Sequence, residues 1–141
     1  MRKHDEMILE FERLFAPQAA HGRFEPNADV YHDEPDGAIL VHVELAGADA
    51  DSLQVALRDS LLVIAGSRAP RDVSRCASLL RKEIQYGEFV KSIRLPAPVR
   101  EDGATAIYRD GILTIRLPLA TTQEYPIVRT EVRMTVRRIP V

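Results

Sequence analysis

The stretch ATAIYRDGILTIRLP, residues 104–118, decides the fold class of this chain. Apolar and polar side chains alternate on both sides of Asp110-Gly111, and this period of two is typical of strands that bury one face. The alternating apolar side chains of the second half are Leu113, Ile115 and Leu117. Asp-Gly between two such runs indicates a tight hairpin turn. Pro118 ends the second run because proline cannot donate to a strand ladder. The stretch therefore predicts an antiparallel β-hairpin.

Short segments with strand character precede this hairpin along the chain. We expect strands at residues 29–34, 38–46, 53–59, 61–66 and 88–96, with a further candidate at 79–85. The run 61–66 is apolar on both faces, as in a strand at the centre of a sandwich. Seven or eight short strands without a helical period between them predict an all-β, immunoglobulin-like antiparallel β-sandwich.

The two ends of the chain differ from this central region. Residues 5–15 carry apolar side chains at three- and four-residue spacings, which predicts a short amphipathic helix that ends before Pro17. Its apolar stripe consists of Met7, Ile8, Phe11, Leu14 and Phe15. Either the stripe packs on the following domain, or it is a surface for another subunit or an unfolded protein. We divide the chain into an N-terminal arm (1–27), one domain (28–119) and an extended C-terminal tail (120–141).

Composition limits the classes of protein to consider. The chain has 141 residues, 45% of them hydrophobic, and a net charge of −2, which fits one globular domain without a basic field for nucleic acid or anionic membrane. The single cysteine, Cys76, excludes an internal disulfide. We read it as a small residue in a polar loop; an intermolecular disulfide and a redox sensor are the alternatives. No stretch approaches a membrane span, and acidic residues interrupt any signal peptide, so we expect a cytoplasmic protein.

Signatures of catalysis and cofactor binding are missing from the sequence. There is no phosphate-binding loop, the histidines have no metal-ligand spacing with Cys76, and no serine has a nucleophile context. The basic cluster within residues 68–82 has few aromatic neighbours, and we read it as a solvated loop or a dimer contact. We expect no enzyme activity, no metal or other cofactor, and no nucleotide, nucleic-acid or membrane partner.

Several stretches together resemble one known family. They are FEPNADVY (24–31), VELAG (43–47), LLVIAGSR (61–68), YGEFVKSIRLP (86–96) and AIYRDGIL (106–113). In order and spacing they are similar to the signatures of small heat-shock proteins, the α-crystallin family, the last being its A-x-x-x-x-G-V-L motif. The chain end, Ile139-Pro140-Val141, is similar to the I-x-I/V tail motif of that family.

The resemblance implies an ATP-independent chaperone, a holdase that binds partly unfolded proteins and prevents their aggregation. It also implies a homodimer that assembles into larger homo-oligomers through Ile139, Pro140 and Val141 of the tail. In the family, the tail motif enters a groove on a neighbouring subunit. By alignment the groove residues here are Leu53, Val55, Leu57, Thr105 and Ile107.

The resemblance further implies how the dimer forms. Bacterial and plant members exchange a strand from a long loop with the first strand of the partner's domain. The lent strand corresponds to Leu79, Leu80, Arg81, Lys82 and Glu83, and its acceptor to Asp29, Val30, Tyr31 and His32. A surface loop without a partner is the alternative for residues 66–86. Lys91, a candidate at the dimer interface, stands where the family usually has arginine, whose planar pairing a lysine cannot reproduce.

The tail departs most from the family pattern. It is longer than usual, and Val132, Met134 and Val136 alternate with polar residues, which is typical of an additional strand or an edge-pairing segment. If it is one, the tail docks differently from the family pattern. The rival to a chaperone is a monomeric β-sandwich interaction module, such as a co-chaperone adaptor, which would lack the tail motif and the long loop.

Overall fold

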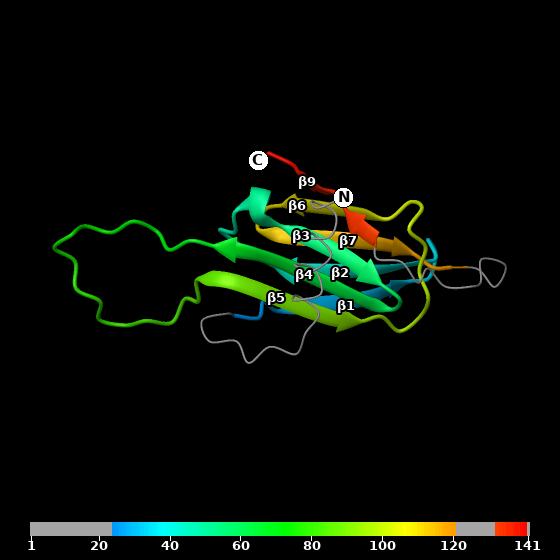
Figure 1. Ribbon diagram of the computed structural model, residues 1–141, viewed down its shortest axis with the longest axis horizontal. Helices are drawn as coiled ribbons and strands as arrows, with labels where there is room; N and C mark the ends of the chain where they lie inside the picture. The colour runs from blue at the N-terminus through cyan, green and yellow to red at the C-terminus, as the bar shows by residue number, and fades with distance from the viewer. Residues whose placement is uncertain (1–23, 121–131, 141) are drawn as a thin grey trace, which may run out of the picture.

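The structure, a computed structural model, describes residues 24–120 and 132–140 (Figure 1). The amphipathic helix expected at residues 5–15, with the stripe proposed to bind clients, lies outside these residues, as does Val141.

Strands account for nearly all of the regular structure. In chain order the elements are β1 (Ala28–Asp33), β2 (Ala38–Glu44), the 3₁₀ turn η1 (Ala50–Ser52), β3 (Gln54–Arg58), β4 (Leu61–Arg68), β5 (Gly87–Arg94), β6 (Thr105–Arg109), β7 (Ile112–Pro118), β8 (Val132–Met134) and β9 (Val136–Arg138). They form two sheets with the orders β1-β2-β7-β6-β9 and β5-β4-β3-β8, which lie one over the other (Figure 1). The predicted all-β sandwich is therefore confirmed.

The hairpin predicted from Asp110-Gly111 joins β6 and β7. Both turn residues have positive φ, 53° for Asp110 and 77° for Gly111, as a two-residue hairpin turn of this kind requires. Across the hairpin, Tyr108 faces Leu113 and Ala106 faces Ile115. Pairing of Ala106 with Ile115 fixes which side of β6 points into the sandwich, because side chains alternate along each strand.

The core lies between the two sheets and is built from the alternating apolar positions of the strands. Its largest fully buried side chains are Phe89, Ile39, Leu45, Leu62, Ile64, Leu113, Ile115, Leu117, Val41, Val43 and Val55. On β4, Leu62 and Ile64 join this core, while Val63 and Ala65 on the opposite face are buried too. The expectation that this strand is apolar on both sides is thus matched by burial on both sides.

Gly66 allows the closest approach within the core. A Cβ built on Gly66 would lie 2.6 Å from the Cζ atom of Phe89 and 3.0 Å from a methyl carbon of Leu53. Such a distance is too short for real atoms, so Phe89 can fill this space only because the residue has no side chain. Phe24 then packs on Phe89 with ring centroids 5.3 Å apart. The glycine of the LLVIAGSR stretch is therefore a packing requirement.

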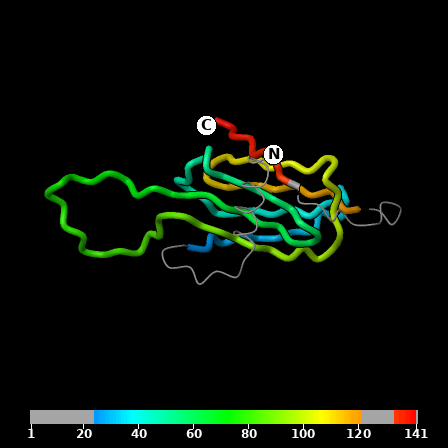
Figure 2. Tube along the Cα trace, viewed as in Figure 1, coloured from blue at the N-terminus to red at the C-terminus, as the bar shows by residue number. Residues whose placement is uncertain are grey.

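The segment between β4 and β5 leaves the sandwich altogether. Residues 69–86 form a long loop that projects beyond the ends of both sheets, as the trace in Figure 2 shows. All of residues 69–86 are described, and none of them belongs to a strand, so the candidate strand at 79–85 is not formed within a single chain. In the described part of the chain, no strand lies beside residues 79–85 for their apolar side chains to pack against.

Candidate functional site

The tail docks on one side of the sandwich through its backbone. β8 pairs antiparallel with β3, so that Met134 faces Val55, and β9 pairs parallel with β6, so that Val136 faces Ala106. Thr135 lies between these two strands and belongs to neither. Beyond β9, the amide of Ile139 donates a hydrogen bond of 3.0 Å to the carbonyl oxygen of Tyr108. The tail thus crosses from one sheet to the other, over the side that we call the β3–β6 edge (residues 54–58 and 105–109).

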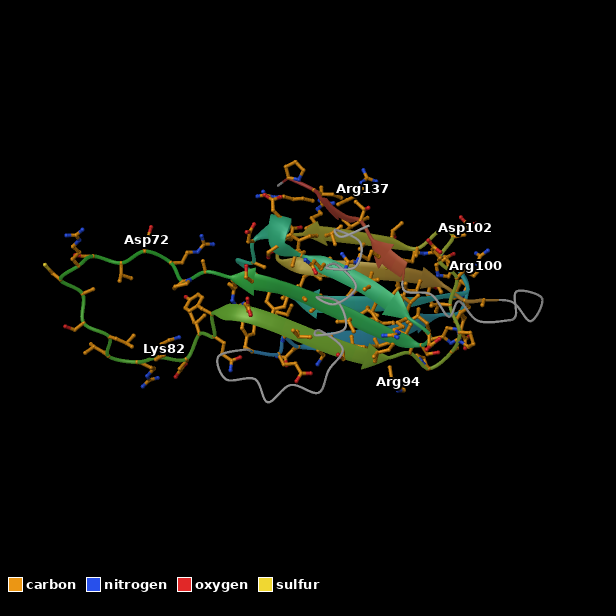
Figure 3. All side chains as sticks on the ribbon, in the orientation of Figure 1. Asp72, Lys82, Arg94, Arg100, Asp102 and Arg137 are labelled. Carbon is orange, nitrogen blue, oxygen red and sulfur yellow. The ribbon has the colours of Figure 1, made fainter. Side chains whose placement is uncertain are left out.

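Alternate side chains of the docked tail point into the sandwich. Met134 and Val136 are half-buried and pack against the hydrophobic core. Arg133, Thr135 and Arg137 are exposed, and Arg137 points away from both sheets (Figure 3). This alternation is what the sequence pattern of the tail suggested, and the structure shows two short strands there.

The residues expected to form the groove lie near the docked tail, though on different faces. Leu53, Val55 and Leu57 are buried in the core beside it. On β6, however, the side that faces the core carries Ala106 and Tyr108, whereas Thr105 is exposed and Ile107 is half-buried. The sequence already indicated which side of β6 faces the core. A two-residue turn at Asp110-Gly111 places Ala106 opposite Ile115, which points inward.

Tyr108 ties the β3–β6 edge to the rest of the domain. Its hydroxyl donates a hydrogen bond to the carbonyl oxygen of Leu45, and its ring belongs to the core. Its carbonyl oxygen is at the same time the acceptor for the Ile139 amide. Sequence reasoning did not single out Tyr108, although it lies in the stretch that decides the fold.

The end of the tail lies past the contact with the core. Ile139 is half-buried and held by its amide, Pro140 is exposed, and Val141 is outside the described residues. The side chains that pack on the core at the β3–β6 edge are therefore those of Met134 and Val136.

The opposite side of the sandwich carries an edge strand. β1 pairs with β2 along its whole length, from Ala28 opposite Val43 to Asp33 opposite Ala38. Among the described residues no strand pairs with the other side of β1. The expected acceptor residues lie here: Asp29, Val30, Tyr31 and His32 are all exposed. An edge strand of this kind presents backbone groups that can pair with another chain.

The residues of the expected lent strand are exposed in the long loop. Leu79 is 73% exposed and Leu80 is 96% exposed, and Ile84 is exposed as well. Between them, Arg81 and Glu83 form an exposed ion pair of 3.5 Å. Figure 3 shows Asp72 and Lys82 on opposite arms of the loop, away from the two sheets.

Arg68 holds the base of this loop. Its guanidinium donates hydrogen bonds to the carbonyl oxygen of Gln85, at 3.0 and 2.5 Å, and to that of Ala46, at 3.2 Å. The same group lies 4.6 Å from the ring centroid of Phe24 and 5.9 Å from that of Tyr86. One planar cation thus joins the end of β4 to the end of the loop and to the segment that enters β1.

Lys91 on β5 has a partner within its own chain. Its ammonium lies 3.1 Å from a carboxylate oxygen of Glu25, and the two side chains are 21% and 66% exposed. In the single chain this lysine therefore connects β5 to the segment that precedes β1.

Within residues 24–120 and 132–140, no three His, Cys, Asp or Glu side chains gather as a metal site would require. Over the same residues, no helix has the length and apolar character needed to span a membrane. Cys76 is exposed in the long loop.

Comparison with known proteins points to one family. The model of the Hsp20/alpha crystallin family matches residues 31–137. A probable 15 kDa heat shock protein of Leptospira interrogans is 31% identical over 93 residues, which is 66% of this chain and 68% of that protein. An alpha-crystallin of Mycobacterium tuberculosis is 32% identical over 128 residues, and the match covers 85% of each chain.

Solved structures agree with these relatives. A small heat-shock protein from Xylella fastidiosa, described as having a distinct high order structure, is 27% identical with a TM-score of 0.60 over 74% of this chain and 95% of its own. Heat shock protein 16.0 from Schizosaccharomyces pombe is 26% identical with a TM-score of 0.60 over 75% of this chain and 99% of its own. Because the family model spans most of the domain and the tail, the chain belongs to the Hsp20/alpha crystallin family of small heat shock proteins.

Proposed function

We propose that this protein is an ATP-independent holdase, which binds partly unfolded proteins and keeps them from aggregating. Membership of a small heat shock protein family supports a chaperone role. The observation that carries the proposal is a pair of β surfaces without a partner in the described chain: a loop with exposed leucines, and an edge strand that is open among the described residues. Such surfaces suit binding of extended, apolar segments without any catalytic group.

The two unfinished surfaces complement each other in a homodimer. Residues 79–83 of one copy would add a strand to β1 of the other, at residues 29–32, and the second copy would return the same contact. A two-fold dimer makes each contact twice, so a leucine that faces the partner counts twice; Leu79 and Leu80, as neighbours on a strand, point to opposite faces. Burying one leucine contributes about 1.5–3 kcal/mol, which would offset part of the entropy lost on association and on ordering of the loop, and the backbone hydrogen bonds of the added strands would contribute as well.

Unfolded clients would use surfaces of the same kind. A denatured chain exposes apolar side chains and unpaired backbone, and both can bind an open strand edge or an apolar stripe. The arm with Met7, Ile8, Phe11, Leu14 and Phe15 is the proposed client-binding segment. Neither step needs a nucleotide, a metal or a reactive side chain.

Larger assemblies would form through the tails. A single docked tail buries few apolar side chains, so one contact alone is weak. Several weak contacts within one assembly reinforce each other through effective concentration, and they can still exchange one at a time. The resulting particle would be stable as a whole and would still release subunits to clients.

Molecular mass and client protection test this function together. We would measure the mass of the full chain by light scattering over a range of concentrations, and then its suppression of aggregation of a heat-labile enzyme. The variant Leu79→Asp/Leu80→Asp should shift the protein toward the mass of one chain and weaken protection. Val73→Asp is the matched control, since Val73 is exposed in the same loop but lies outside the lent strand.

The opposite result identifies the rival function. A wild-type protein that keeps the mass of one chain at every concentration and does not protect the heated enzyme contradicts the proposal. It would instead favour a monomeric interaction module such as a co-chaperone adaptor.

A further inference from the structure

We propose that the outer face of the four-stranded sheet is the docking site for the N-terminal arm of the same chain. The site is the outer apolar patch, which we define as Ala56, Leu61, Val63, Ala65 and Val90. The occupant is the amphipathic helix predicted at residues 5–15, with its apolar stripe against the sheet. One consequence, which rests on the function proposed above, is that a docked stripe is not available to a client.

Side chains at the centre of the patch are buried although they point away from the core. Ala56, Val63 and Ala65 alternate with core residues along β3 and β4, so they lie on the face that the second sheet does not cover. They are nevertheless only 0%, 1% and 7% exposed. A valine on an uncovered sheet face keeps contact with water, so this burial indicates a second layer over the patch.

The outer face of the other sheet provides a direct comparison. Its central positions are Leu40 and His42 on β2 and Thr114 on β7, and all three side chains are half-buried. Both faces belong to one sandwich, so the difference comes from what lies over them. The four-stranded sheet is the front one in Figure 1, and none of the described strands crosses its outer face. A segment other than these strands must therefore cover the patch.

The arm joins the domain at the edge of this same sheet. Phe24 forms a β-bridge with Phe89 on β5, and its amide donates a hydrogen bond of 3.1 Å to the carbonyl oxygen of Glu88. Residues 16–23 connect Phe24 to the predicted helix and can span up to about 26 Å. The helix would be about 16 Å long, and four strands lie across about 14 Å. The arm of the same chain can therefore reach the patch and cover it.

The sizes of the side chains fit this arrangement. Two central positions of the patch are alanines, Ala56 and Ala65, which leave room for large side chains of an opposing layer. A helix this short cannot bury its own apolar stripe, so the stripe requires a surface to cover it. The stripe supplies the large side chains Met7, Ile8, Phe11, Leu14 and Phe15.

Charges around the patch complement those of the arm. Arg58 and Arg94 flank Leu61 in the two ladders of β4, and Arg133 lies opposite Ala56. All three arginines are exposed, so the rim of the patch is basic. Within residues 5–15, the only basic residue is Arg13, and the acidic ones are Asp5, Glu6, Glu10 and Glu12. Docking would bury the stripe at the centre and bring opposite charges together at the rim.

Fluorescence of the full chain tests the docking. The chain contains no tryptophan, so Phe15→Trp places one reporter in the arm, and Cys76→Ser removes the only thiol. Ser92→Cys, at an exposed position opposite Val63, carries a bimane dye, which quenches tryptophan on contact. We expect the reporter to lose most of its emission. The same dye on Thr105→Cys, at an exposed outer position of the other sheet, is the control and should leave the emission unchanged.

Substitutions in the arm show whether the stripe makes the contact. Phe11→Asp places a charge at the centre of the stripe and should restore the emission of the reporter. Leu9→Asp is the matched control, because Leu9 is equally apolar but lies two positions from Phe11, on about the opposite side of the helix. It should keep the quenching. Equal emission with the dye on either sheet, or quenching that persists in Phe11→Asp, overturns the proposal.

Mixed chains identify whose arm occupies the patch. One chain carries the tryptophan and the other carries the dye on β5, and the two are refolded together. We expect quenching when both probes are on one chain and none when they are on different chains. Quenching between chains would assign the patch to the arm of a second copy and would overturn docking within the chain.

An unfolded client separates this inference from the proposed function. A heat-labile enzyme, added at a temperature that unfolds it, should restore the emission as it takes over the stripe, and its aggregation is measured alongside. Quenching in the resting protein together with unhindered aggregation of the enzyme would support docking and contradict the chaperone function. Protection of the enzyme by a protein whose reporter is never quenched would support the function and contradict docking.

Discussion

In the single chain, the tail covers one side of this sandwich, whereas the other side has an edge strand that is open among the described residues. At the β3–β6 edge, the tail adds a short strand to each sheet and places Met134 and Val136 against the core. At β1, the edge strand has no second partner among the described residues, although strand-forming residues exist in the long loop. The difference lies in how each complement is attached. The tail follows the last strand of the domain, β7, along the chain, whereas residues 69–86 are held at both ends between β4 and β5.

Attachment at both ends makes the loop a poor partner for its own β1. It leaves the ends of β4 and β5 and projects beyond them, while β1 lies in the other sheet (Figure 2). In the dimer proposed above, a second copy would bring its β1 to the loop without bending the loop. The tail thus completes the β3–β6 edge within one chain, and β1 is the edge that the proposed dimer would complete.

Removal of residues 132–141 should have the largest effect on stability, because it leaves the β3–β6 edge open, as β1 is. Loss of two half-buried apolar side chains and two short ladders should lower the free energy of unfolding by about 3 kcal/mol. Urea denaturation of the dilute protein measures the change. Hydrogen exchange should rise at Ala56 and Tyr108 and stay the same in β1. Equal stability with and without the tail would mean that its docking contributes nothing.

Gly66→Ala perturbs the core that both sides share. The new methyl group would meet the ring of Phe89, so overpacking should destabilise the fold by about 2 kcal/mol. Thermal unfolding checks this, and Gly37→Ala is a useful comparison, because a Cβ at Gly37 has nothing within 4 Å and the cost there comes from its positive φ alone. A Gly66 variant as stable as wild type would contradict the close packing.

Arg68→Lys should weaken the proposed dimer contact of the long loop, and it should leave the tail docked at the β3–β6 edge. Lysine keeps the charge but cannot make the planar contacts that join Gln85, Ala46 and Phe24. We expect faster hydrogen exchange at the base of the loop and a dimer dissociation constant raised about fivefold, equivalent to about 1 kcal/mol. Sedimentation measures the constant. Arg58→Lys, on β3, serves as a comparison in the other region, and an equal effect there would argue against a specific role for Arg68.

Glu25→Gln should have the smallest effect. The ion pair with Lys91 is largely solvated on the glutamate side, so its loss should change the free energy of unfolding by no more than about 0.5 kcal/mol, and less at high salt. Denaturation at two salt concentrations measures this. A loss several times larger would indicate that the pair fixes the path of the chain into β1.

Local sequence pattern was enough to predict most of the sandwich. Alternation at Leu113, Ile115 and Leu117 and the Asp110-Gly111 turn gave the β6–β7 hairpin, because these signals depend on neighbouring residues alone. Alignment with the family predicts that Thr105 and Ile107 line the groove, whereas the hairpin register turns Ala106 and Tyr108 toward the core.

The remaining features depend on contacts between distant residues. Alternation in the tail indicates a strand, but it does not identify β3 and β6 as the partners, since β3 lies far away along the chain and β7 lies between β6 and the tail. For residues 79–85 the pattern indicates strand-forming potential, and no strand forms in the described structure because pairing needs a complement. The roles assigned to the loop, to β1 and to Lys91 in a dimer stay predictions.

The exposed ion pair in the long loop bears on solubility. Leu80 is almost fully exposed, and it is followed at once by Arg81, Lys82 and Glu83. Charged residues next to an unpaired apolar run discourage indiscriminate stacking of strands, as they do at the edges of natural sheets. Single copies would therefore resist stacking on one another, and the proposed chaperone would be protected from its own aggregation by the same few residues.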